Sequence, residues 1–211
     1  MSEICEALHH LFQQLPTFGF PFDSRELPGN GIYILYESGE LAHETSRIVR
    51  IGTHRGDSRL PLRLEEHFLR EKKDRSIFRR NIGRAILHKA NDPFLAQWDI
   101  DLTARQARIT NSGKIDHARL KAVEKQVTDY IQQNFRFVVF RVDDKEKRLS
   151  LESAIISTVS LCDKCQPTDN WLGLHSPIKK IEESGLWLVQ KLYKTPLSDR
   201  EFGELRRLVI S

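Results

Sequence analysis

The strongest constraint on the fold is a pair of short apolar segments that each contain a glycine. They are GIYILYE, residues 31 to 37, and RIVRIG, residues 47 to 52. Segments rich in β-branched and aromatic side chains are typical of strands, and the polar stretch SGELAHETS between them is typical of a loop. The sequence therefore predicts a β-hairpin, whose glycines leave room for a ligand to approach the backbone.

Helical patterns surround this hairpin. Apolar residues recur at helical spacing in residues 3 to 15, from about 61 onward, and in residues 76 to 90, 117 to 134 and 147 to 162, with two further helical patterns after residue 176. A third strand, FRFVVFRVD, occupies residues 135 to 143, whereas residues 92 to 116 have turn character and no clear period. Interleaved strands and helices predict an α+β domain with a small antiparallel or mixed three-stranded sheet flanked by helices.

The domain organisation follows from this order of elements. A chain of 211 residues fits one domain with elaborations. We expect an N-terminal helix and loop over residues 1 to 30, a core over residues 31 to 175 with an insertion at about 91 to 134, and a helical C-terminal extension over residues 176 to 211.

Charge gives a first indication of the partner. The net charge is +4, a value that favours an anionic partner only weakly. Between Arg70 and Lys89, however, Lys and Arg are opposed only by Glu71 and Asp74. This local excess could neutralise several phosphates, and the alternative is a solvated helix face.

The cysteines indicate the compartment. Cys5, Cys162 and Cys165 are an odd number, which argues against a disulfide framework and for a reducing, cytoplasmic compartment. CDKC, residues 162 to 165, has the spacing of zinc ligands, but His175 is the only further ligand nearby, so we favour no zinc centre from this motif. No apolar run is long enough to span a bilayer and no signal-peptide pattern is present, so we expect no membrane partner.

The hairpin could also carry chemistry. Side chains alternate along a strand, and the partner strand can bring Arg50 near Tyr33. A guanidinium beside a phenol favours the phenolate, which could take a proton from water at a phosphodiester. The alternative is that Tyr33 only packs in the core.

Further motifs follow the hairpin in a defined order. GIY at 31 to 33 and RIG at 50 to 52 precede RLEEH at 63 to 67, and Glu152 in SLESAII and Asn170 in QPTDNWLG come later. This order resembles that of the GIY-YIG nuclease family, over about residues 31 to 173. The sequence departs from the family pattern in two ways: Arg50 stands where the family usually has Tyr, and the loop between the tripeptides is longer.

The resemblance implies a metal-dependent endonuclease with a defined set of residues. Tyr33 would be the general base, Arg63 would bind phosphate through its planar fork, and Glu152 would hold Mg²⁺ or Mn²⁺. The implied catalytic set is completed by Arg50, by His67, which lies one helical turn after Arg63, and by Asn170, which would orient groups near the metal. His54 is an alternative to His67 for proton transfer or for holding phosphate.

The substrate that we expect is duplex DNA. Basic residues would contact the DNA backbone, and the insertion could enter a groove of the DNA. The predicted DNA contacts are His54, Arg55, Arg79, Arg80 and Arg84. A restriction-type enzyme is the preferred interpretation, because the catalytic domain carries its own elaborations and no separate binding module. A repair or mobile-element nuclease would have nearly the same sequence features.

Two interpretations outside nucleases stay open. Arg50 favours a non-catalytic nucleic-acid-binding protein that retains the fold, and a structural or interaction module would leave Arg63 and Glu152 far apart. A nuclease instead needs Tyr33, Arg50, Arg63 and Glu152 in one cleft. A homodimer would let one active site per chain cut both strands, but the sequence identifies no dimer surface.

Overall fold

The computed structural model describes residues 2–210, apart from the side chain of Ser112. Strands near the N-terminus are followed by a run of helices, then by a further strand and more helices. The elements are α1 (Ser2–Gln13), β1 (Phe18–Gly19), η1 (Ser24–Glu26), β2 (Gly31–Ala42), β3 (Thr45–Gly52), α2 (Leu60–Phe68), η2 (Lys73–Arg75), α3 (Ile77–Lys89), α4 (Leu95–Trp98), α5 (Arg105–Asn111), η3 (Ser112–Lys114), α6 (His117–Asn134), β4 (Phe135–Arg141), α7 (Lys145–Ser160), η4 (Leu172–His175), α8 (Lys179–Ser184) and α9 (Asp199–Ile210).

The sheet has four antiparallel strands in the order β1-β4-β2-β3, so the α+β class is confirmed and the prediction of three strands is wrong. The extra strand is β1, in which Phe18 and Gly19 pair with Phe137 and Arg136 of β4. Two residues in a loop rich in proline, glycine and aromatic side chains carry no period, and the sequence pattern therefore could not reveal this strand.

The hairpin is longer than predicted. The stretch that we expected to be a loop mostly continues the two strands, which meet at a tight turn through His43 and Glu44. Both turn residues have positive φ, 50° and 61°, as a two-residue hairpin turn requires. The register shifts after Leu35, so Val49 is an extra residue of β3 next to Arg50.

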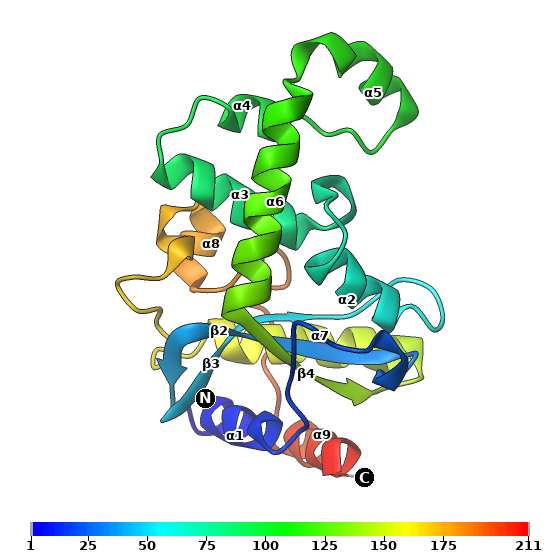
Figure 1. Ribbon diagram of the computed structural model, residues 1–211. Coiled ribbons are helices and arrows are strands. Elements are labelled where there is room, and N and C mark those ends of the chain that lie inside the picture. The colour runs from blue at the N-terminus through cyan, green and yellow to red at the C-terminus, as the bar shows by residue number, and fades with distance from the viewer. Residues whose placement is uncertain (1, 211) are drawn as a thin grey trace.

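Helices cover both faces of the sheet. Alternate residues of β2 face opposite sides: Ile32 and Ile34 pack with α1, α7 and α9, whereas Tyr33 and Leu35 pack with α2, α3, α6 and α8. Figure 1 shows α1 and α9 on one side of the sheet and α2, α3 and α6 on the other. In the part of the chain that is described, no helix is long and apolar enough to cross a membrane.

The segment from residue 91 to 134 combines a core helix with a projection. Val123, Val127 and Ile131 of α6 are fully buried near the sheet. At the other end of α6, α5 has no buried residue and lies far from the sheet (Figure 1). The proposed domain boundaries stay a prediction.

Candidate active site

The two glycine tripeptides meet in the sheet. Tyr33 lies opposite Gly52, and Leu35 lies opposite Arg50, which puts Tyr33 and Arg50 on one face of the hairpin. A side chain at position 52 would collide with the ring and hydroxyl of Tyr33, and one at Gly31 would collide with a backbone oxygen of β4. Both positions therefore need glycine. Gly52 lets the Tyr33 ring lie against β3, and Gly31 lets β4 pair closely with β2.

The hydroxyl of Tyr33 begins a chain of hydrogen bonds. It lies 2.8 Å from Nε2 of His67, and Nδ1 of His67 lies 2.7 Å from Oγ of Ser76. Ser76 is the N-cap of α3, where its Oγ also accepts the backbone N–H of Arg79. Tyr33 and His67 are both buried, so the chain leads from Tyr33 into the protein.

His67 is neutral in this environment. Burial, with the charges of Arg63, Arg50 and Arg79 nearby, holds its pKa well below the usual value of a histidine. A neutral imidazole has one N–H, so its hydrogen bonds to Tyr33 and to Ser76 run in one direction along the chain. When Tyr33 donates to Nε2, Nδ1–H donates to Ser76, and Nε2 can take the phenol proton.

A cleft of about 470 Å³ opens beside Tyr33. The hairpin, α2 and α7 each contribute side chains to its wall, and so does the segment after α8. Six of the residues that the sequence singled out line this cleft together: Tyr33, Arg50, His54, Arg55, Arg63 and Glu152.

The two arginines in the cleft are held differently. Nε of Arg50 lies 3.5 Å from the Tyr33 hydroxyl, while its Nη1 donates to the backbone oxygen of Trp187 and its guanidinium lies over the ring of Phe78. Arg63 uses Nη1 for Glu66, at 3.2 Å, and for a backbone oxygen of η2. Among the described residues its Nη2 has no partner, which leaves that edge of the guanidinium for an anion in the cleft.

Glu152 is the only carboxylate among the described residues that line the cleft. Its Oε2 accepts from Nζ of Lys191 at 2.5 Å, and Oε1 accepts no hydrogen bond within the described chain. An oxygen donor that faces an open cleft fits Mg²⁺ or Mn²⁺, because Mg²⁺ is usually held by one or two carboxylates with waters and substrate phosphate. Glu152 is the residue that would hold the ion.

His54 lies at the edge of the cleft. Its Nε2 accepts the backbone N–H of Gly31 at 3.3 Å, and its Nδ1 is buried without a partner in the described chain. Burial, with the charge of Arg148, lowers its pKa, so it is a neutral donor at this edge.

The structure places two predicted site residues elsewhere. Asn170 is exposed and lines a separate cavity with Glu37 and Glu40, so it does not reach the cleft of Tyr33. His67 is buried behind Tyr33 and does not line the cleft, which leaves it in contact with the phenol rather than with a bound phosphate.

Three of the arginines that we predicted to contact DNA instead form ion pairs with carboxylates of the protein itself. Arg79 is completely buried, and its Nη2 lies 2.9 Å from Glu124 and 2.7 Å from Oγ1 of Thr128. A buried guanidinium cannot reach a DNA backbone, so the placement of Arg79 corrects that expectation. Arg80 and Arg84 are mostly covered and are paired: Arg80 with Asp74 and Asp101, and Arg84 with Asp99.

Other cations, which the sequence analysis did not single out, are better placed. A second cavity of about 600 Å³ adjoins the cleft and shares Thr53, His54, Arg55, Arg63 and Ile77 with it. Exposed Arg59 and Arg75 also line it, and with Arg55 they have no ion-pair partner within the described residues. No local pattern distinguishes these arginines from the paired ones, because their partners or lack of partners depend on the fold. Lys191 and Asn81 of the cleft were missed for the same reason.

Comparison with known proteins identifies the family. A family model described as a GIY-YIG domain matches residues 4–210. No curated protein and no solved structure matches the chain. Members of the family are nucleases, generally dependent on a divalent metal ion, and such a domain implies DNA as substrate. With the matched region spanning almost the whole chain, this protein belongs to the GIY-YIG nuclease family.

Proposed function

We propose that this protein is a metal-dependent DNA endonuclease whose active site is the cleft lined by Tyr33, Arg50, Arg63 and Glu152. The observation that carries the proposal is the convergence of these four side chains, from β2, β3, α2 and α7, on one cavity. A structural module would have no reason to gather a phenol, two guanidiniums and a lone carboxylate around open space.

Tyr33 is the proposed general base. Water attacks the phosphorus atom and gives its proton to the Tyr33 oxygen, while the Tyr33 proton passes to Nε2 of His67 at 2.8 Å. Because His67 is neutral, its Nε2 offers a lone pair to this proton during the transfer, while its Nδ1–H donates to Ser76. The P–O bond to the leaving oxygen breaks, and that oxygen takes a proton from solvent in the open cleft.

Charge stabilisation is the proposed task of the cations. Arg63 has a free guanidinium edge for a phosphate oxygen, and Arg50 supports negative charge on the Tyr33 oxygen from 3.5 Å. Lys191 adds a third cation, bound to Glu152. A divalent ion on Glu152 would supply Lewis-acid stabilisation of the pentacoordinate phosphorus.

Duplex DNA is the proposed substrate, with restriction-type cleavage the preferred role. Arg55, Arg59 and Arg75 would contact backbone phosphates along the adjoining cavity, and the projecting α5, with exposed Arg105 and Arg108, is suited to reach a groove. These elaborations sit on the catalytic domain itself, which supports a self-contained enzyme that reads and cuts DNA.

Supercoiled plasmids of varied sequence test the proposal. The purified chain should nick or linearise DNA with Mg²⁺ or Mn²⁺ and should be inactive with EDTA, and discrete fragments would support sequence-specific cleavage. DNA retardation without cleavage across varied plasmids and a large genomic DNA would instead support a binding protein that retains the fold.

A further inference from the structure

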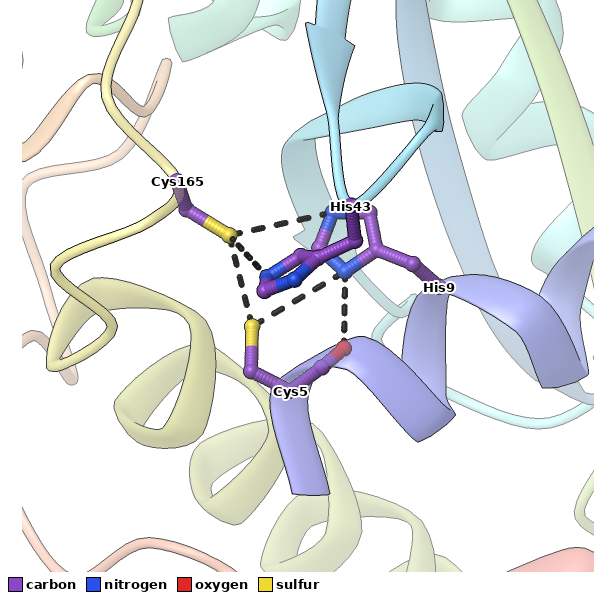
Figure 2. Close-up of side chains that lie close together, drawn as sticks. All are labelled: Cys5, His9, His43 and Cys165. Atoms are coloured by element: carbon purple, nitrogen blue, oxygen red, sulfur yellow. Dashed lines mark hydrogen bonds between the residues drawn. The ribbon is translucent and has the colours of Figure 1, made fainter. Parts of the chain in front are cut away.

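A cluster of cysteine and histidine side chains lies away from the active-site cleft, on the face of the sheet covered by α1 and α7. Figure 2 shows Cys5 and His9 of α1, His43 at the hairpin turn and Cys165 after α7 converging on one point. One donor atom from each lies within 4.8 Å of all the others. We propose that this cluster and the adjacent Cys162, whose Sγ lies 3.5 Å from Nε2 of His43, form a structural Zn²⁺ site, independent of the divalent ion proposed for Glu152.

The three cysteines are all available as ligands. Cys5, Cys162 and Cys165 are buried and free, and the Sγ atoms of Cys5 and Cys165 lie 3.3 Å apart, well beyond the roughly 2.05 Å of a disulfide bond. Cys162 and Cys165 form the CxxC spacing that zinc sites use. Three free thiols in one place supply the soft sulfur ligands that Zn²⁺ prefers.

His43 has the geometry of a fourth ligand. Its Nε2 lies 3.3 Å from Sγ of Cys165 and 3.5 Å from Sγ of Cys162, while its Nδ1 faces Glu6 at 3.8 Å. A tetrahedral zinc with Zn–S of about 2.3 Å and Zn–N of about 2.0 Å spaces sulfur and nitrogen by about 3.5 Å. A carboxylate at the other ring nitrogen is the usual support of a zinc-bound histidine.

His9 is better suited to supporting the site than to binding the ion. Its Nδ1 lies 2.8 Å from the backbone oxygen of Cys5, and its Nε2 accepts the backbone N–H of Ile48 at 3.2 Å. Both ring nitrogens are therefore engaged, and no lone pair remains for a metal. The ligand set that we assign is Cys5, His43, Cys162 and Cys165, a combination that selects Zn²⁺.

The ion would join segments that are distant in sequence. Cys5 and Cys165 are 160 positions apart, and His43 is 122 positions from Cys165. The site thus ties α1 to the tip of the hairpin that carries Tyr33 and to the end of the helix that carries Glu152. Binding would release protons from the three thiols to solvent and should stabilise the fold, because the site forms only in the folded chain.

Metal analysis of tag-free, full-length protein tests this proposal without measuring cleavage. Protein purified with reduced thiols should contain one Zn²⁺ per chain, and Co²⁺ exchanged into it should give tetrahedral d–d bands and a sulfur-to-cobalt charge-transfer band. Removal of the ion by a chelator should lower the melting temperature, and added Zn²⁺ should restore it. A wild-type protein with three reduced thiols that takes up neither Zn²⁺ nor Co²⁺ would overturn the proposal.

Variants test the ligand set. Cys162→Ser should reduce the charge-transfer intensity of bound Co²⁺ by about a third, because one of three thiolates is lost. His9→Asn should keep the metal, as should the matched control His10→Asn, which changes an exposed histidine of the same helix. Full charge-transfer intensity in Cys162→Ser, or loss of the metal only in His9→Asn, would overturn the assigned set. The wild-type Co²⁺ spectrum counts thiolates even where a variant fails to fold.

Discussion

The hydroxyl of Tyr33 lies 2.8 Å from Nε2 of His67, inside the protein and directly behind the proposed active-site cleft. His67 thus contacts the phenol and does not line the cleft. This relationship gives Tyr33 a proton acceptor that the strand pairing alone would not supply, and it defines how the site should respond to pH.

His67 should remain neutral at pH values where exposed histidines are protonated. Its folded pKa is lowered mainly by burial, so the unfolded chain takes up a proton below about pH 6.5 that the folded chain does not. The free energy of unfolding should therefore fall as the pH drops through this range. A histidine NMR titration checks this, with His67→Gln to assign the signal; protonation of that signal near pH 6.5 in the folded protein would contradict the predicted lowering of the His67 pKa by burial.

Gly52→Ala should damage the site more than the fold. The added methyl group would meet the hydroxyl and ring of Tyr33, and overpacking of this kind costs about 1–3 kcal/mol of unfolding free energy. Displacing Tyr33 from His67 should lower the cleavage rate by at least about 100-fold, which is the smallest rate enhancement that a general base typically provides. Gly203→Ala is the control, since a methyl group there meets no atom nearby; equal rates for the two variants would argue against Tyr33 as the base.

The unpaired arginines should carry DNA affinity. Replacing Arg55, Arg59 or Arg75 with Ala should weaken binding to all duplexes alike and reduce the salt dependence of the binding constant by about one unit of slope per lost phosphate contact. Fluorescence anisotropy at several salt concentrations measures this. Arg206→Ala, at an exposed position of α9, should behave as wild type. An unchanged salt dependence of binding in all three variants of the adjoining cavity would show that DNA does not contact this cavity.

Arg79 should matter for stability rather than for DNA contact. Its guanidinium is buried against Glu124 and Thr128, so Arg79→Met leaves a buried carboxylate unpaired and should cost about 3–5 kcal/mol of unfolding free energy. Urea denaturation measures the loss. Joint replacement of Arg79 and Glu124 by apolar residues should recover much of it, whereas a stable Arg79→Met protein with weakened DNA binding would restore the sequence-based expectation.

The sequence predicted local features well and distant partners poorly. Strand alternation was enough to place Tyr33 and Arg50 on one face, and helical periodicity located the helices that carry Arg63 and Glu152. Arg79 looked like a DNA contact because its partner, Glu124, lies 45 positions away, where no local pattern reports it. Asn170 kept its place in the motif order but lies beside a different cavity.

The cysteine cluster illustrates the same limit. CDKC has a recognisable spacing, but the further donors come from α1 and from the hairpin turn rather than from a neighbouring motif. His175, the only nearby histidine in sequence, uses its backbone oxygen to bind His88 instead. Topology, which brings the ends of separate elements together, is the information that the linear pattern lacks.

Cleavage by Glu152→Gln is the measurement that tests the proposed nuclease site most directly. The wild type, Glu152→Gln and Glu146→Gln, which changes an exposed carboxylate of the same helix, would be compared on plasmid DNA with Mg²⁺ and in a DNA-binding assay. We predict that Glu152→Gln binds DNA like the wild type but cleaves at less than about one-hundredth of its rate, while Glu146→Gln cleaves normally. Metal-dependent cleavage by Glu152→Gln at the wild-type rate would contradict the assignment of Glu152 to the active site.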